Sequence, residues 1–298
     1  MKLMAVRSKG LAVADGDEAV LLGSEFGDMV DVVCNWEMVA PRLRSAIAST
    51  KSTRLSLDAL DLAPPISRFR RDVLCTGWNY WDHFEEGRDL RPEIDRPEAP
   101  TFFTKSPDSI IGPYDPIAYD PRVSSKWDYE AELVLVIGRT GRNIPTTKAF
   151  EHVFGYCLGN DTSARDLQFR HGTQWTKGKG IDNTTPLGPT IITADELDLD
   201  NLRLECVVND ELRQSASIKQ MAFAIPEIIA ELSFGMTLHA GDVVFTGTPA
   251  GVGQSRKPPV FLRDGDLVVV RGSGLGELRN RVTKTDLYGD TDLQIISQ

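Results

Sequence analysis

Residues 128–138 read Asp128-Tyr129-Glu130-Ala131-Glu132-Leu133-Val134-Leu135-Val136-Ile137-Gly138, and this stretch decides how we interpret the chain. Its leucine and β-branched residues are typical of a strand, in which alternate side chains share a face. One face carries only apolar side chains: Ala131, Leu133, Leu135 and Ile137. The other carries two carboxylates and two valines: Glu130, Glu132, Val134 and Val136. Because both faces are largely apolar, we expect the strand to be buried on both sides.

The two glutamates of this strand pose an electrostatic problem. A rise of about 3.3 Å per residue places Glu130 and Glu132 roughly 7 Å apart on one face. Burial of two like charges is unfavourable unless a cation pairs with them or they take up protons. A cation that prefers oxygen ligands, such as Mg²⁺ or Mn²⁺, resolves the conflict. A solvent-exposed glutamate end of the strand is the alternative explanation.

Length and composition are those of an ordinary soluble globular protein. The chain has 298 residues, of which 41% are apolar and 26% charged, with a formal net charge of −10. Such an acidic chain is not a general binder of nucleic acids or membrane surfaces. The sequence has no apolar run long enough to span a membrane, and its first residues lack the apolar run of a signal peptide. Its four cysteines are scattered, so they indicate neither a zinc site nor a disulfide framework. We therefore expect a cytoplasmic protein.

The pattern of apolar runs and turns predicts two parts, a small N-terminal domain (residues 1–70) and a catalytic domain (residues 71–298). The first is expected to have short strands, a helix over residues 31–47 and a linker over residues 60–65. In the second, short β-branched runs alternate with glycine and proline turns, a pattern typical of a β-rich α+β domain. Its predicted strands cover residues 73–76, 131–137, 154–158, 202–208, 243–246, 267–270 and 278–282. Its predicted helices cover residues 147–153 and 226–234.

Two further segments carry side chains suited to catalysis. Asp161 follows a predicted strand and offers a third carboxylate, although Asn-Asp at a strand end is more often a turn or a helix cap. His83 and Glu86 share one face if they lie on a helical turn. A carboxylate that orients an imidazole raises its basicity, as a general base requires, and a surface ion pair is the alternative. The charged, proline-containing residues 88–100 that follow are interpreted as a mobile loop and a candidate lid.

Five motifs, in their order along the chain, resemble those of the fumarylacetoacetate hydrolase family. They are Gly-x-Asn-Tyr-x-x-His-x-x-Glu at 77–86, Asp-Tyr-Glu-x-Glu-Leu at 128–133, Asn-Asp-x-Ser-Ala-Arg-Asp-x-Gln at 160–168, Gln-Trp-x-x-Gly-Lys-x-x-Asp at 174–182 and Thr-Gly-Thr-Pro-x-Gly-Val-Gly at 246–253. The resemblance runs from about residue 72 to residue 285. It implies a mixed β-roll with few helices, preceded by a small N-terminal domain, and a homodimer.

The resemblance also implies roles for particular residues. One divalent cation per subunit, Mg²⁺ or Mn²⁺, is expected on the matching carboxylates: Glu130, Glu132 and Asp161. His83 and Glu86 match a pair that activates water. The residues expected around the substrate carbonyl are Arg165, Gln168 and Lys179. Thr248 matches a residue that holds a substrate carboxylate or oxo group, and the predicted substrate-binding set is completed by Lys105, Gly247 and Tyr80. Asp182 matches a recurrent polar position.

The activity that the resemblance implies is cleavage of a C–C bond in a 2,4-dioxo acid, such as an acylpyruvate of aromatic catabolism. We expect His83 to take a proton from water, and Lys179, Arg165 and Gln168 to stabilise the oxyanion. The same scaffold supports an oxaloacetate-type decarboxylase, a keto–enol tautomerase or a dienedioate isomerase. A metal-binding protein without catalysis is the alternative from another class. Gly180 stands where many family members carry serine, and this departure bears on substrate preference.

Overall fold

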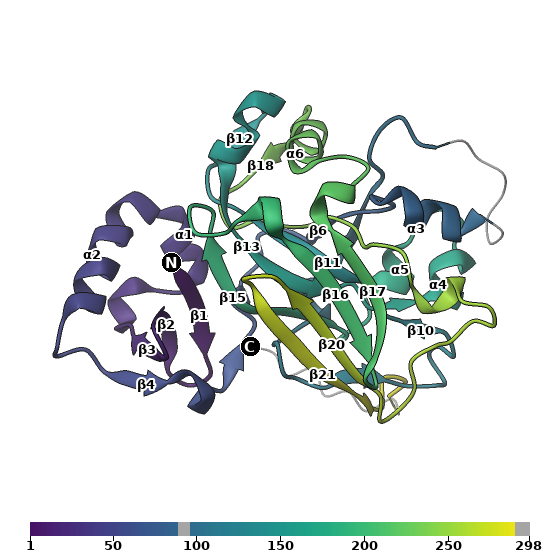
Figure 1. Ribbon diagram of the computed structural model, residues 1–298, viewed down its shortest axis with the longest axis horizontal. Helices are drawn as coiled ribbons and strands as arrows, with labels where there is room; N and C mark the ends of the chain where they lie inside the picture. The colour runs from purple at the N-terminus through teal and green to yellow at the C-terminus, as the bar shows by residue number, and fades with distance from the viewer. Residues whose placement is uncertain (89–95, 290–298) are drawn as a thin grey trace.

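The computed structural model describes residues 1–88 and 96–289 (Figure 1). In this part of the chain most strands belong to two sheets and the helices are short, which confirms the predicted β-rich α+β class. No helix among the described residues is long and apolar enough to cross a membrane. Residues 89–95 of the predicted lid lie outside the described residues. The homodimer and the domain boundary near residue 70 stay predictions.

The larger sheet is mixed and has twelve strands within the described ranges. Their bounds are β1 Lys2–Val6, β2 Gly10–Asp15, β3 Glu18–Leu21, β4 Arg54–Ser56, β5 Leu62–Ala63, β6 Val73–Thr76, β7 Phe102–Lys105, β8 Ile110–Ile111, β11 Ala131–Ile137, β13 Val153–Asn160, β15 Thr185–Thr193 and β19 Val243–Phe245. The main path runs β4-β3-β2-β1-β15-β13-β11-β19-β6-β7, with β5 beside β1 and β8 beside β15. The predicted strand over residues 131–137 therefore lies inside the sheet, paired on both edges.

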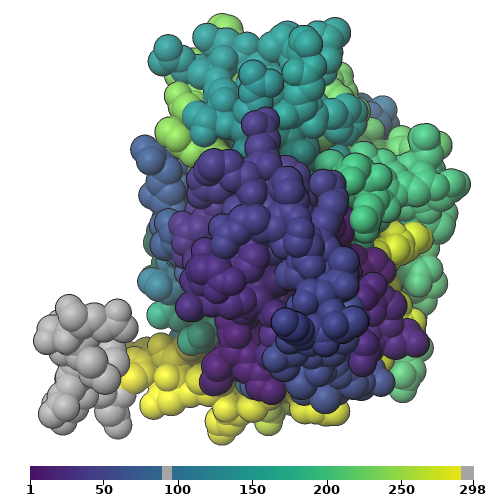
Figure 2. Space-filling view, turned by 90° about the vertical axis from the view of Figure 1, so that its left-hand side faces the viewer, coloured from purple at the N-terminus to yellow at the C-terminus, as the bar shows by residue number. Residues whose placement is uncertain are grey.

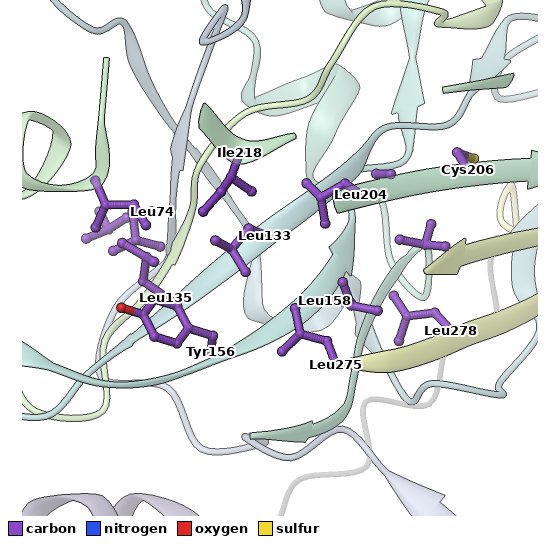
Figure 3. Packing of buried hydrophobic residues seen from close by; sticks show 14 of the residues in the cluster. Leu74, Leu133, Leu135, Tyr156, Leu158, Leu204, Cys206, Ile218, Leu275 and Leu278 are labelled. Atoms are coloured by element: carbon purple, nitrogen blue, oxygen red, sulfur yellow. The ribbon is translucent and has the colours of Figure 1, made fainter. Parts of the chain in front are cut away.

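A second sheet of five strands packs against the first. Its order is β17-β16-β20-β21-β9, from Glu211–Ser217, Arg203–Val208, Leu267–Gly272, Gly276–Lys284 and Ile117–Tyr119. Two small ribbons pair β10 (Trp127–Asp128) with β14 (Ser163–Ala164), and β12 (Gly141–Arg142) with β18 (Thr237–Leu238). Leucines of both sheets meet in one buried cluster, among them Leu133, Leu158, Leu204 and Leu278 (Figure 3).

Strand β11 is buried on both faces, as its sequence predicts. Leu133 and Leu135 belong to the cluster between the two sheets. Val134 and Val136, on the opposite face, belong to a second cluster that includes apolar residues of the N-terminal segment. Both clusters fix which way each side chain of β11 points, because a shift of one residue would exchange the faces.

The N-terminal segment continues the larger sheet, because β1 pairs antiparallel with β15. Its helices α1 (Met29–Cys34) and α2 (Trp36–Ala48) replace the single helix predicted over residues 31–47. The break falls at Asn35, which ends α1 and begins α2. Within the predicted linker, β5 pairs with β1. Figure 2 shows this segment, in purple and blue, covering the middle of one face of the molecule.

The remaining helices are short. They are α3 Trp81–Glu86, α4 Arg165–Arg170, α5 Thr176–Lys179 and α6 Ile225–Ser233. The 3₁₀ turns are η1 Ser24–Phe26, η2 Leu57–Ala59, η4 Pro107–Ser109, η5 Thr146–His152, η6 Leu199–Asn201, η7 Ile218–Gln220 and η8 Gly253–Ser255. The helix predicted over residues 226–234 is confirmed as α6, whereas the one over 147–153 is a 3₁₀ helix, η5. Helices α3, α4 and α5 lie together at one end of the molecule (Figure 1).

Replacement of Leu133 by alanine tests the central position of β11. Because this side chain is fully buried between the two sheets, Leu133→Ala is expected to lower the free energy of unfolding by about 2–5 kcal/mol. The matched control is Leu212→Ala on β17, whose side chain is 53% exposed and whose loss is expected to change it by at most about 0.5 kcal/mol. Urea denaturation measures both, and equal effects would contradict this account of the core.

Candidate active site

Three carboxylates meet because of the register between β11 and β13. The strands are antiparallel with Ala131 opposite Asn160, so Glu130, just before β11, lies beside Asp161, just after β13. The Asp161 N–H donates to the Glu130 carbonyl at 2.9 Å. Oxygens of Glu130, Glu132 and Asp161 lie within 4.8 Å of one another, and all three residues are buried. The predicted carboxylate cluster is therefore confirmed, and the alternative of a solvent-exposed glutamate end is wrong.

Three buried cations bind this cluster from different elements. The Lys179 Nζ, at the end of α5, lies 2.6 Å from a carboxylate oxygen of Glu130 and 2.6 Å from one of Asp161. The Lys105 Nζ, at the end of β7, lies 2.6 Å from the other Asp161 oxygen. The Arg165 Nη2, at the start of α4, lies 2.6 Å from Glu130. These contacts hold α4, α5 and β7 against the ends of β11 and β13.

Asp128 is a fourth buried carboxylate, which the sequence analysis did not single out. It accepts from Arg165 Nε at 2.9 Å and from the backbone N–H groups of Gly253 at 2.7 Å and Gln254 at 3.0 Å. Asp128 therefore connects the guanidinium of Arg165 to the loop that follows β19. Its place in the Asp-Tyr-Glu motif was the only sequence signal for it.

Glu132 differs from its neighbours because no ion pair within the described ranges involves it. One of its oxygens accepts the backbone N–H of Gly247 at 2.7 Å. Burial, together with the charges of Asp161 and Glu130, raises the pKa of Glu132 well above its ordinary value. Burial also acts to raise the pKa of Glu130, but the charges of Arg165 and Lys179 outweigh it and hold that pKa below its usual range.

The charge balance of the cluster suits a divalent cation. Four buried carboxylates (Asp128, Glu130, Glu132 and Asp161) face three buried cations (Lys105, Arg165 and Lys179). Ionisation of all four carboxylates leaves one negative charge in excess, and Glu132, which has no cationic partner in the described part of the chain, is the carboxylate that a bound cation would neutralise. Carboxylate oxygens are the ligands that Mg²⁺ and Mn²⁺ prefer. The donor set of Glu130, Glu132 and Asp161 therefore fits such an ion.

The predicted pairing of His83 with Glu86 is confirmed on α3. The His83 Nδ1 lies 2.7 Å from one Glu86 oxygen, and the other oxygen accepts the backbone N–H of Gly251 at 2.8 Å. Because an ionised carboxylate only accepts, Nδ1 carries the proton, and Nε2 of the neutral imidazole is an acceptor. His83 lines the same cavity as Glu130 and Glu132. The imidazole is thus placed to exchange protons with a molecule bound there.

The other predicted residues fall into two groups. Arg165, Gln168, Lys179 and Thr248 line the cavity. The Thr248 hydroxyl donates to the Ala131 carbonyl at 3.0 Å, and Gln168 accepts from Arg165 Nη1 at 3.0 Å.

The second group is buried or next to the carboxylates but does not line the cavity: Lys105, Gly247 and Tyr80. Lys105 and Gly247 contact carboxylates of the cluster, and a side chain at Gly247 would lie 2.9 Å from the Gly77 carbonyl oxygen. Burial, and next the charge of Glu132, raises the pKa of Tyr80. We interpret this group as support for the carboxylates, and direct contact with substrate stays a prediction. Asp182 is exposed.

Several residues of the cavity were missed by the sequence analysis. Trp78, Phe103 and Trp175 contribute aromatic side chains to its lining. Thr76, at the end of β6, also lines it, and its buried hydroxyl has no hydrogen-bond partner in the part of the chain that the structure describes. Trp78 and Trp175 stand inside the quoted motifs, but nothing in those motifs shows that they face one cavity.

Comparisons of the sequence with known proteins identify a family and similar proteins. The profile of the family described as "Fumarylacetoacetate (FAA) hydrolase C-terminal" matches residues 72–283. The oxaloacetate tautomerase YisK of Bacillus subtilis is 44% identical over 228 residues, which cover 76% of this chain and 74% of that protein.

Two solved structures are similar over nearly the whole chain. A fumarylacetoacetate hydrolase from Exiguobacterium antarcticum matches with a TM-score of 0.80 and 36% identity, covering 96% of this chain and 100% of its own. The maleylpyruvate hydrolase from Sphingobium sp. SYK-6, in complex with manganese(II) and pyruvate, matches with a TM-score of 0.79 and 28% identity over the same shares.

Glu132→Gln tests the charge balance of the cluster. Because the pKa of Glu132 is higher in the folded protein than in the unfolded chain, the metal-free protein loses stability as the pH rises through the interval between the two values. Glutamine removes this loss, so the variant is expected to melt at a higher temperature in chelator near neutral pH. It is also expected to bind Mn²⁺ at least ~10-fold more weakly, since a carboxylate ligand is lost.

Thermal unfolding in EDTA and calorimetric titration with Mn²⁺ give the two readouts. Glu205→Gln, on the half-buried position of β16 away from the cluster, is the matched control and is expected to change neither. A lower melting temperature for Glu132→Gln in EDTA, or an unchanged affinity for Mn²⁺, would contradict the proposed excess of negative charge.

Proposed function

The chain belongs to the fumarylacetoacetate hydrolase family, and from this premise we propose that it is a metal-dependent tautomerase that interconverts the keto and enol forms of a 2-oxo acid. One observation carries the proposal: the imidazole of His83 lines the same cavity as Glu130 and Glu132. The identity to a relative named for oxaloacetate tautomerisation supports it. The sequence analysis placed hydrolysis first and tautomerisation among the alternatives, and this similarity reverses their order.

The proposed chemistry divides between a bound ion and the residues of the cavity. Glu130, Glu132 and Asp161 would hold Mg²⁺ or Mn²⁺, which when bound supplies Lewis-acid polarisation of the substrate oxygens. His83 takes a proton from the carbon next to the keto group, and the keto oxygen takes up a proton, which completes the enol. The same two transfers in reverse regenerate the keto form, while Glu86 holds the ring of His83. The ammonium of Lys179 and the amide of Gln168 provide donors near the oxygen that gains negative charge.

Hydrolytic cleavage of a 2,4-dioxo acid is a second candidate, favoured by the same His83–Glu86 pair. An imidazole oriented by a carboxylate can take its proton from water as readily as from carbon. The two similar structures named as hydrolases support this alternative. Loss of the ultraviolet absorbance of an enol, without release of a cleaved product, identifies tautomerisation. Stoichiometric pyruvate from an acylpyruvate identifies hydrolysis.

Removal of the metal is expected to abolish either activity. Excess EDTA should reduce the rate of enol loss to the uncatalysed rate in buffer, because the carboxylates alone cannot polarise the substrate oxygens. Mg²⁺ or Mn²⁺ added in excess over the chelator should restore the rate. Full activity in EDTA would exclude the metal-dependent proposal.

His83→Ala is expected to lower kcat at least ~10²-fold, because the variant lacks the proton acceptor. His171→Ala is the matched control, since His171 is exposed and does not line the cavity, and its kcat is expected to stay within about twofold. Steady-state kinetics with metal present measure both variants. An unchanged kcat for His83→Ala would remove this residue from the mechanism.

A further inference from the structure

Gln214, on strand β17 of the second sheet, is a buried glutamine that contacts the start of β11 and the loop after β19. Its side-chain oxygen accepts the main-chain N–H of Ala131 at 3.0 Å. Its amide nitrogen donates to the Thr248 hydroxyl at 2.8 Å and to the Pro249 carbonyl at 2.7 Å. Both N–H groups of the amide therefore have acceptors, and these partners fix which end of the amide is oxygen.

Hydrogen bonds join Gln214, Thr248 and Ala131 in a closed ring, which fixes the direction of the Thr248 hydroxyl. Because a carbonyl oxygen only accepts, the single hydroxyl proton of Thr248 points to the Ala131 carbonyl, at an O···O distance of 3.0 Å. The amide of Gln214 occupies one lone pair of the same hydroxyl. The hydroxyl therefore has no proton left to donate to a substrate carboxylate or keto oxygen.

This ring lies where β11 extends beyond its neighbour β19. Strand β19 pairs with residues 134–136 of β11 and ends at Phe245. The N–H and carbonyl of Ala131 lie beyond that pairing, and Gln214 and Thr248 supply their hydrogen-bond partners. Since Ala131 stands between Glu130 and Glu132, the ring connects the loop after β19 to the strand that carries these two carboxylates.

The main-chain N–H of Thr248 is the donor that remains for a bound molecule. Thr248 lines the cavity and is buried, and its N–H has no hydrogen-bond acceptor within the described ranges. The N–H of the preceding residue, Gly247, already donates to Glu132 at 2.7 Å. Buried N–H groups in folded proteins are nearly always paired, so a free N–H at a cavity indicates a partner that binds there.

We propose that Gln214 is a positioning residue, which directs the hydroxyl proton of Thr248 to Ala131 so that Thr248 binds a substrate oxygen through its main-chain N–H. This inference rests on the proposed function, in which the substrate is a 2-oxo acid, and adds a residue that does not itself touch the substrate. Gln214 does not line the cavity, and its side chain hydrogen-bonds to Ala131, Thr248 and Pro249. It therefore acts on the substrate through Thr248.

Gln214→Met tests this role, because methionine has a similar length and lacks the amide. Calorimetric titration with pyruvate at saturating Mg²⁺ is expected to show at least fivefold weaker binding, since the N–H of Thr248 loses its fixed place. Gln220→Met is the matched control and should stay within twofold of wild type, because Gln220 is exposed and does not line the cavity. Unchanged affinity of Gln214→Met would overturn the inference alone, whereas failure of the wild type to bind pyruvate would overturn the proposed function as well.

Variants of Thr248 distinguish positioning from a general loss of stability. Thr248→Val breaks the same ring, so the double variant with Gln214→Met is expected to bind pyruvate no more weakly than the weaker single variant. Thr248→Ser keeps the hydroxyl and should bind within twofold of wild type. Fold changes that multiply in the double variant would contradict the role of Gln214. If Gln214→Met does not fold, Gln214→Glu keeps the acceptor for Ala131, removes the amide donors and provides the same test.

Discussion

The antiparallel register of β11 against β13 is the constraint on which the site depends. It places Glu130 beside Asp161 and directs Glu132 to the same face. A slip of one residue would turn Glu132 towards the cluster between the sheets and bring a leucine to the cavity. Apolar burial on both faces of β11 prevents such a slip, because every exchanged side chain would meet the wrong environment. The packing of the core therefore determines where the three carboxylates lie.

The charges gathered by this register hold the surrounding elements together. Lys105, Arg165 and Lys179 come from β7, α4 and α5, and each reaches a carboxylate beside β11 or β13. Buried ion pairs gain little net stability, but loss of one partner leaves an uncompensated charge and is strongly unfavourable. The arrangement thus ties three separate segments to one geometry. Glu132 is left without a cation of the described chain, and this is the position that a metal ion would stabilise.

The sequence predicted those features that depend on local pattern. Alternation identified the two faces of β11, and the spacing of His83 and Glu86 identified their pairing on α3. Features that depend on partners distant in sequence were missed. Periodicity does not predict the pairing of β1 with β15. It also does not predict that Trp78, Phe103 and Trp175 lie together, because each residue alone is an ordinary apolar position. The sequence also did not predict the type of helix at η5, which is a 3₁₀ helix.

One loop positions both halves of the site through its main chain. The Gly251 N–H holds Glu86, while the N–H groups of Gly253 and Gln254 hold Asp128 and, through it, Arg165. Gly251 has a φ of +109°, and a Cβ there would lie 2.0 Å from the Arg213 carbonyl oxygen, so this backbone accepts only glycine. The imidazole of His83 is therefore set at a fixed place relative to the carboxylates. The two candidate activities differ in the group that would give its proton to this imidazole, the substrate carbon in tautomerisation and water in hydrolysis.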